Sequence, residues 1–137
     1  MQVAVWDTYV KKENGSVLHF DILVPETVTD PAVIFQYGYA YLDGENGASG
    51  RLETENCKLC HIETPTPEVV QGIEQHGYFI IDLGDIPAAL PAEATRRDLI
   101  LHLRGHYPQY RFADFMGKSE AEVREIVAGL TPPPASP

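Results

Sequence analysis

Apolar and polar residues alternate along the first 24 positions of the chain. Residues 2–10 and 16–24 are rich in Val, Ile, Tyr and Phe, and they flank the turn signal Glu13-Asn14-Gly15. An Asn-Gly pair tolerates the positive φ angles of a tight hairpin turn. The pattern therefore predicts an antiparallel β-hairpin.

The register of this hairpin decides which side chains share a face. With Asn14 and Gly15 as a two-residue loop, Tyr9 stands opposite Phe20 and Val5 stands opposite Val24. A shift of one residue would invert the faces, because side chains alternate along a strand. The predicted buried face contains Val3, Val5, Tyr9, Leu18, Phe20, Ile22 and Val24, and the other face contains Thr8, Val10, His19 and Asp21.

Helix signals follow at two places. Asp30-Pro31 and Thr66-Pro67 each place a capping residue before a proline at the first helical position. They predict helices at 30–42 and 66–76. Gly77 is a suitable residue to end the second helix, and the apolar run after it predicts a strand at 77–83.

The remaining residues predict a mainly helical end. A proline-rich connector at 86–91 precedes a predicted helix at 93–103, a short strand at 110–115, and a helix through 130 that begins with the capping box Ser119-Glu122. The sequence thus predicts an α+β fold with a hairpin and further strands in one sheet packed by helices. Residues 1–84 form the α+β domain, 85–130 form an extension that packs on it, and 131–137 form a disordered tail.

Charge restricts the partners of the chain. Ten Lys and Arg against twenty Asp and Glu give a formal net charge of −10, which opposes binding to nucleic acid. The apolar runs are shorter than the roughly 20 residues of a membrane-spanning helix, and the N-terminus has no basic segment or small-residue cleavage site. We expect a cytoplasmic protein that binds neither nucleic acid nor membrane.

The segment Cys57-Lys58-Leu59-Cys60-His61 is the strongest candidate for chemistry. Two thiols and an imidazole at this spacing suit a zinc knuckle, a dithiol redox centre or a haem attachment site. A zinc site would use Cys57, Cys60 and His61, with His19 as the best additional ligand; the pair His102 and His106 is an alternative. The opposing interpretation is that both cysteines are small buried side chains.

The local geometry of this segment separates these interpretations. Turn-favouring residues 54–56 precede it, and the alternation after Leu59 predicts a strand from Leu59 to Glu63. Cys60 and Ile62 would then point to one face, with Cys60 buried, and Leu59 and His61 would point to the other. Elsewhere, Asp7 and Asp21 interrupt apolar strands and are compatible with a general acid/base pair or with an exposed strand face.

Two functions remain open from the residues alone. The first is a non-catalytic binding or regulatory module, with a homodimer formed through the helix that carries Tyr37, Tyr39 and Tyr41, because tyrosine is favoured at interfaces. It needs no cofactor. The second is a metal- or thiol-dependent enzyme that uses Cys57, Cys60 and His61.

Three segments together carry a resemblance to a known family. They are Trp6 to Val10, His19 to Pro25, and Cys57 to Glu63, followed by the strand sequence GYFIID. Over residues 1–84 the chain resembles a small bacterial family catalogued as a domain of unknown function, number two thousand and twenty-four. The resemblance implies an α+β fold and no assigned activity. Typical members stop soon after the GYFII strand, so residues 85–137 depart from the family pattern.

Overall fold

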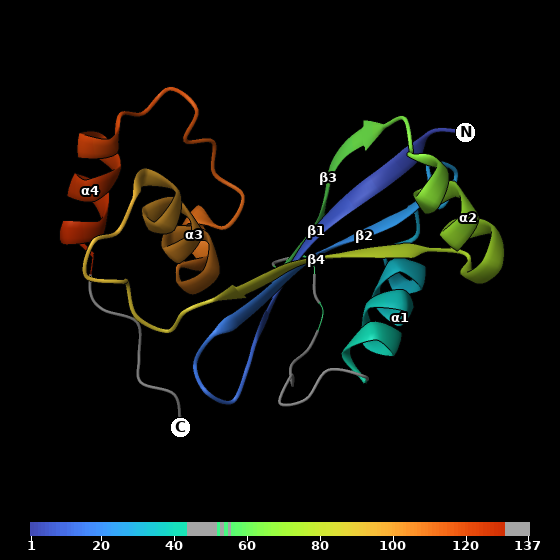
Figure 1. Ribbon diagram of the computed structural model, residues 1–137, viewed down its shortest axis with the longest axis horizontal. Coiled ribbons are helices and arrows are strands. Elements are labelled where there is room, and N and C mark those ends of the chain that lie inside the picture. The colour runs from blue at the N-terminus through green and yellow to red at the C-terminus, as the bar shows by residue number, and fades with distance from the viewer. Residues whose placement is uncertain (44–51, 53, 55, 131–137) are drawn as a thin grey trace.

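The fold is a four-stranded antiparallel sheet with helices on both faces (Figure 1). The structure is a computed structural model that describes residues 1–43, 52, 54 and 56–130. The predicted α+β class is confirmed. The sheet has the strand order β3-β1-β2-β4. The strands are β1 (Val3–Lys11), β2 (Val17–Pro25), β3 (Cys57–Glu63) and β4 (Phe79–Ile86), and the helices are α1 (Pro31–Leu42), α2 (Pro67–His76), α3 (Arg96–His106), the 3₁₀ turn η1 (Pro108–Tyr110) and α4 (Glu120–Ala128).

The capping residues begin the helices where the sequence predicts. The Asp30 side chain accepts a hydrogen bond from the Ala32 amide at the start of α1, and the predicted Ser119-Glu122 capping box is formed at α4. Gly77 ends α2 with a φ of 87°, a conformation that favours glycine. The predicted helices at 30–42 and 66–76 are therefore confirmed. The predicted disordered tail at 131–137 lies outside the described residues.

Two predictions for the C-terminal half differ from the structure. The helix predicted at 93–103 is present as α3, but it begins at Arg96, because Thr95 and Asp98 form a capping box there, and it ends at His106. The predicted strand at 110–115 is absent, and η1 and turns stand in its place. The carbonyls of this segment accept hydrogen bonds from arginine side chains of α3, since Arg96 donates to Phe115 and Arg104 donates to Ala113. These bonds satisfy backbone groups that a strand would have paired.

The hairpin register differs by one residue from the predicted one. Tyr9 stands opposite His19, not Phe20, and Asp7 stands opposite Asp21. The Lys12 amide donates to the Ser16 carbonyl, so the loop has three residues, and its last residue, Gly15, has a φ of 87°. This geometry is typical of the three-residue hairpin with a glycine at its left-handed position. The predicted assignment of faces is wrong for β1 as a consequence.

Helices pack on both faces of the central strands. The face that carries Trp6, Phe20 and Ile22 packs against α1 in the largest hydrophobic cluster. On the opposite face, α2 covers one end of the sheet through Val69 and Ile73. Helix α3 covers the other end, where Leu101 contacts a cluster of Tyr9, Val17 and Ile86. The middle of that second face lies between the two helices.

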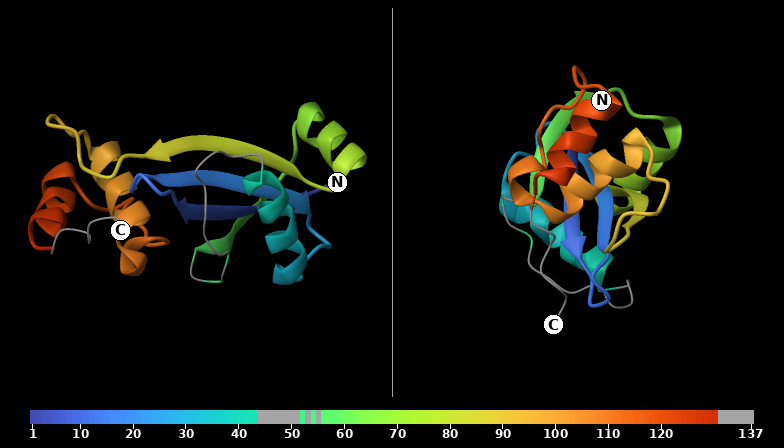
Figure 2. Two further views of the ribbon diagram at one scale, coloured as in Figure 1. Left: turned by 90° about the horizontal axis from the view of Figure 1, so that it is seen from below. Right: turned by 90° about the vertical axis from the view of Figure 1, so that its left-hand side faces the viewer.

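Residues 95–130, here called the C-terminal lobe, have a hydrophobic cluster of their own. Leu99, Leu103, Phe115 and Val123 are buried together between α3 and α4. Figure 2 shows this lobe beyond one end of the strands, with α1 and α2 near the other end. Within the described part of the chain, no helix has the length and apolarity needed to cross a membrane.

Candidate functional site

Three polar side chains occupy the middle of the sheet face between α2 and α3. Asp7 of β1 and Asp21 of β2 are cross-strand partners, and His19 lies two residues before Asp21 on the same face. One donor atom from each of the three lies within 4.8 Å of the others. The one-residue difference in hairpin register is what brings them together, because the predicted register put Asp7 on the opposite face.

The histidine is held from two sides. Its Nε2 atom lies 2.6 Å from Asp7 Oδ1. The Tyr9 ring stacks on the imidazole with 4.3 Å between centroids and an interplanar angle of 8°. Tyr9 is only 2% exposed, so it forms a rigid backing for the His19 ring.

The two carboxyl groups have opposite electrostatic environments. Burial acts to raise the pKa of Asp7, but the hydrogen bond and charge of His19 outweigh it and lower that pKa. For Asp21, burial together with the hydrogen bond and charge of Asp7 raises the pKa to about 7. Neighbouring carboxyl groups respond in this way because two like charges at short range are unfavourable. Near neutral pH the pair can therefore hold one proton.

Each outer strand has an irregularity beside this face. On β3, Trp6 pairs with Leu59 and Val5 with His61, so Cys60 is an extra residue. On β4, two residues, Leu83 and Gly84, stand opposite His19 alone. Bulges of this kind redirect side chains and are common next to functional sites.

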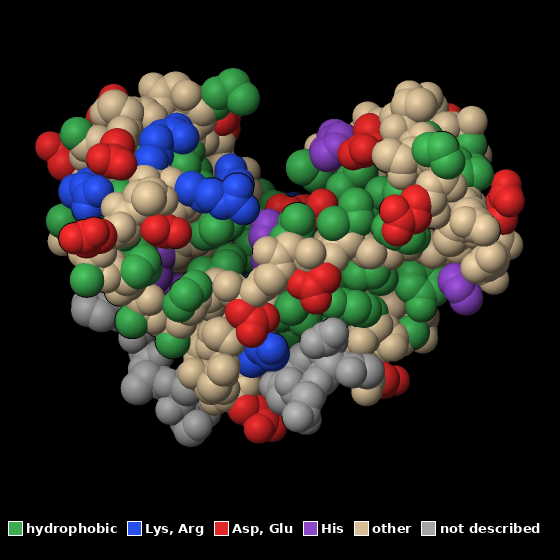
Figure 3. Space-filling model, viewed as in Figure 1, with side chains coloured by type: hydrophobic (Ala, Val, Ile, Leu, Met, Phe, Trp, Pro, Cys, Tyr) green, Lys and Arg blue, Asp and Glu red, His purple; other side chains and the backbone are tan. Residues whose placement is uncertain are grey.

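A cleft of about 730 Å³ opens next to His19. Figure 3 shows it as a notch between the two halves of the molecule, with acidic side chains on its floor and basic side chains on the wall formed by the C-terminal lobe. Among the described residues, its lining contains four basic residues and one acidic residue apart from His19. The lining residues are His19, Arg96, Arg97, Ile100, Leu101, Arg104, Asp114, Phe115, Met116 and Lys118.

The four basic side chains differ in how far they are free to bind a ligand. Arg96 donates hydrogen bonds to the carbonyls of Phe115 and Lys118, and these bonds hold that loop in place. Arg104 donates one bond to the Ala113 carbonyl, while its Nε is buried without a partner among the described residues. Arg97 and Lys118 are exposed. Neither has an ion-pair partner within the described ranges.

The predicted site segment is divided between the two faces of β3. Cys57 is 1% exposed and packs in the cluster beneath α1, where its Sγ accepts a hydrogen bond from Thr8 at 3.2 Å. Cys60 is exposed, so the prediction that it is buried is wrong. The bulge is the reason, because Cys60 is the extra residue and no longer follows the alternation of side chains between the two faces. Leu59 and Ile62 pair with Trp6 and Ala4, which belong to the face that packs against α1.

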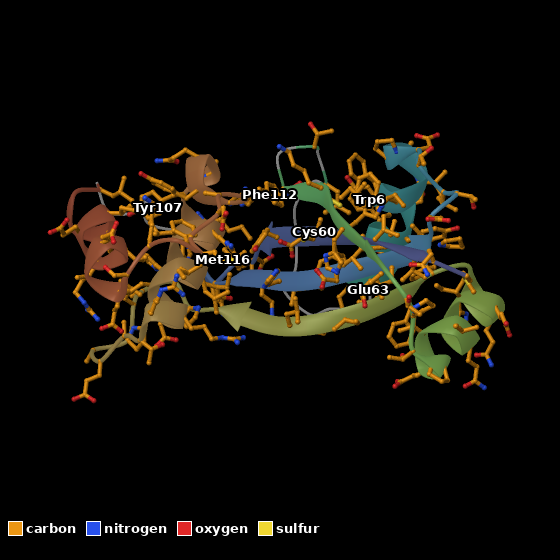
Figure 4. All side chains as sticks on the ribbon, turned by 90° about the horizontal axis from the view of Figure 1, so that it is seen from above. Trp6, Cys60, Glu63, Tyr107, Phe112 and Met116 are labelled. Atoms are coloured by element: carbon orange, nitrogen blue, oxygen red, sulfur yellow. The ribbon has the colours of Figure 1, made fainter. Side chains whose placement is uncertain are left out.

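Cys60 and His61 lie near the Asp7 face and apart from Cys57. Partial burial and the charges of Asp7 and Asp21 raise the pKa of the Cys60 thiol. The His61 Nε2 atom lies 2.6 Å from Glu63 Oε1 at the surface. Figure 4 shows Cys60 and Glu63 on β3, with Phe112 and Met116 extending from the C-terminal lobe.

Of the four predicted zinc ligands, His19 belongs to a group that is close enough to share an ion. Over residues 1–43, 52, 54 and 56–130, that group consists of Asp7, His19 and Asp21, and no such group contains a cysteine. A zinc site at Cys57, Cys60, His61 and His19 stays a prediction. The alternative pair, His102 and His106, has its rings 5.0 Å apart on α3.

The two thiols should react at very different rates. We expect Ellman's reagent at pH 8 to modify one thiol of the folded protein, Cys60, and to modify Cys57 only after unfolding in guanidinium chloride. Cys57 is buried, and burial raises its pKa to about 11, so little reactive thiolate is present. Absorbance at 412 nm follows both phases. The Cys60→Ser variant should lose the fast phase and Cys57→Ser should keep it; two fast equivalents would contradict the structure.

The sequence indicated three residues of this site but not that they lie together. His19 was predicted as a zinc ligand, and Asp7 and Asp21 as a general acid/base pair. The register of the predicted two-residue loop placed Asp7 on the face opposite to His19 and Asp21. The basic wall was missed. Its signal is present in the sequence, because residues 96–118 hold five of the ten Lys and Arg of an acidic chain.

The fold and site together define an α+β protein whose sheet carries an open Asp-His-Asp face beside a basic cleft. The family model described as "Domain of unknown function (DUF2024)" matches residues 1–83, and the chain belongs to this family. It is also similar to the NMR structure of protein NE1680 from Nitrosomonas europaea, with 39% identity and a TM-score of 0.51. That match covers 61% of this chain and 95% of that chain. The curated proteins give no match.

Proposed function

We propose that the protein binds a small molecule with an anionic group, a phosphate or a carboxylate, in the cleft beside His19. The observation that carries this proposal is the concentration of Arg97, Arg104 and Lys118 on one wall of that cleft. The chain as a whole has a net charge of −10. A basic lining in an acidic chain attracts anions locally, and the negative remainder of the surface disfavours an extended polyanion.

The size of the cleft also supports a small ligand. Sites for small molecules usually enclose about 300–1,000 Å³ and combine apolar walls with a few polar groups. The cleft has about 730 Å³, and Ile100, Leu101 and Phe115 provide apolar lining beside the arginines. Arginine is suited to the task because its guanidinium group donates two parallel hydrogen bonds to a phosphate or carboxylate.

The test compares anion binding by the full chain and by two variants. Inorganic phosphate and acetate, titrated separately and followed by NMR shifts of backbone amides, distinguish the two kinds of anion. We expect shifts in α3 and in residues 113–118. The double variant Arg97→Ala/Lys118→Ala should weaken binding by about tenfold or more, because two charge-assisted hydrogen bonds are lost.

The matched control is Arg124→Ala. Arg124 lies on α4, where it pairs with Glu120 and donates to the Ala94 carbonyl, and it does not line the cleft. Its replacement should leave the affinity unchanged. Equal affinity of the double variant and the wild type, or equal loss in the control, would refute the proposal.

The alternative function, an enzyme that uses Cys57, Cys60 and His61, receives less support. A nucleophilic cysteine needs a lowered pKa, as beside a cation or a helix N-terminus. In this chain the pKa of each thiol is raised, and Cys57 packs beneath α1 while Cys60 lies near the Asp7 face. A binding or regulatory role is therefore the function we favour.

The homodimer through α1 and the cytoplasmic location stay predictions. The tyrosines of α1 have contacts within the chain: Tyr37 stacks on Tyr78, the Tyr39 hydroxyl accepts a hydrogen bond from the Leu52 amide, and the Tyr41 hydroxyl donates to Asp82. These contacts give the aromatic residues of the helix a role in the monomer. These tyrosines are therefore explained without a second copy of the chain.

A further inference from the structure

We propose that Asp7, His19 and Asp21 form a binding site for one divalent transition-metal ion, with its remaining coordination positions open towards the cleft. This site does not use Arg97, Arg104 or Lys118, and the inference does not depend on anion binding. His19 is shared, because it also lines the cleft.

The spacing of the three side chains suits a metal ion. Ligand atoms at about 2.0–2.2 Å from a zinc ion are separated from one another by roughly 3–3.5 Å. The donor atoms of Asp7, His19 and Asp21 already lie within 4.8 Å of one another, so small side-chain rotations are sufficient to surround an ion. All three stand on adjacent strands inside the sheet, where the backbone is fixed by hydrogen bonds on both sides. Sites built on strands hold their ligands precisely.

The donor types select a class of ion. Magnesium and calcium prefer sites made of oxygen atoms alone, whereas imidazole nitrogen favours zinc and other first-row transition metals. Two carboxylates and one imidazole supply three ligands, which is the number that zinc sites with an open position use. The ion would take the place of the hydrogen bond between His19 Nε2 and Asp7 Oδ1, because both atoms would turn their lone pairs to it.

A second, independent observation is the buried hydroxyl of Tyr9. Tyr9 is 2% exposed, and its hydroxyl has no hydrogen-bond partner of ordinary geometry among the described residues. Tyr9 stands two residues from Asp7 on the same face of β1, and its ring stacks on the His19 imidazole, so the hydroxyl lies beside the three proposed ligands. A metal ion that draws Asp7 into a fixed orientation would let the hydroxyl donate to it, as outer-shell groups do at metal sites.

The charge of the site also favours a bound cation. Within the described residues, neither Asp7 nor Asp21 has an ion pair with a lysine or arginine. Two half-buried carboxyl groups side by side are costly unless a proton or a cation neutralises one of them.

The experiment measures metal binding by the full chain, purified without a histidine tag and treated with a chelator. Isothermal titration with Zn²⁺ and loss of the free Mn²⁺ signal in electron paramagnetic resonance should each give one ion per chain. Asp21→Asn and His19→Asn should each lower the affinity at least tenfold, and Mg²⁺ should compete poorly. Absence of binding by both ions would overturn the proposal.

Matched variants separate this site from the cysteine segment and from the anion-binding wall. Cys57→Ser, Cys60→Ser and His61→Asn should keep full affinity for Zn²⁺, and so should Arg97→Ala/Lys118→Ala. Loss of binding in the cysteine variants with retention in Asp21→Asn would assign the ion to the cysteines instead. If Asp21→Asn disturbs folding, seen as a changed near-ultraviolet circular dichroism spectrum, Asp21→Glu provides the second measurement. It keeps the carboxylate and should bind Zn²⁺ more tightly than Asp21→Asn does.

Discussion

Replacing Phe20 with alanine is expected to lower the free energy of unfolding by about 3–5 kcal/mol. Phe20 is fully buried in the cluster between the sheet and α1, and its ring lies 4.9 Å from that of Tyr41. Truncation leaves a cavity that the paired strands on both sides of β2 cannot close. The loss is a large part of the 5–15 kcal/mol that stabilises a typical domain.

Urea denaturation followed by circular dichroism measures this loss. Met116→Ala is the control, because Met116 is 89% exposed and its removal should change the free energy of unfolding by no more than about 0.5 kcal/mol. Similar midpoints for Phe20→Ala and the wild type would show that Phe20 is not at the centre of the core.

Replacing Leu103 with alanine should also destabilise the chain, by about 2–5 kcal/mol, but in a different part. Leu103 is fully buried between α3 and α4, in the cluster of the C-terminal lobe. This cluster is separate from the two that join the sheet to α1 and α2. We therefore expect the lobe to open before the sheet unfolds.

Native-state hydrogen exchange distinguishes the two variants. In Leu103→Ala, amides of α3 and α4 should exchange much faster, while those of β1 and β2 should stay close to their wild-type rates. In Phe20→Ala, the amides of β1 and β2 should be the ones that accelerate. Uniform acceleration across the whole chain in both variants would mean that the lobe and the sheet unfold as one unit. The same data test the predicted division between residues 1–84 and 85–130.

The sequence predicted most helices and strands because their signals are local. Caps at Asp30, Thr66 and Ser119 depend on neighbouring residues only, and the structure confirms the helices that follow them. The hairpin register was not predictable in the same way. The pair Asn14-Gly15 suits both a two-residue loop and a three-residue loop. In the three-residue loop of this chain, the Asn14 side chain accepts hydrogen bonds from the amide and hydroxyl of Ser16.

The candidate site depended on that same choice. A shift of one residue in the register places the Asp7 side chain on the other face of the sheet relative to His19 and Asp21. No local sequence pattern could therefore show that these three side chains lie together. The bulge at Cys60 arises from the pairing of β3 with β1, which is a contact between distant parts of the chain. The residues of the cysteine motif are close to one another in the sequence, so the motif is recognisable there. Asp7, His19 and Asp21 are brought together only by the pairing of β1 with β2.

The bulges of β3 and β4 have a consequence for how copies of the chain can meet in concentrated solution. These two strands are the edges of the sheet, and a regular edge is a template on which another strand adds and starts aggregation. The extra residue at Cys60 breaks the regular spacing of one edge, and the bulge at Leu83-Gly84 breaks that of the other. A strand of a second copy could form hydrogen bonds with either edge for a few residues only, because the bulge then shifts the edge strand out of register with it. The irregularities that flank the site are therefore also expected to disfavour growth into fibres.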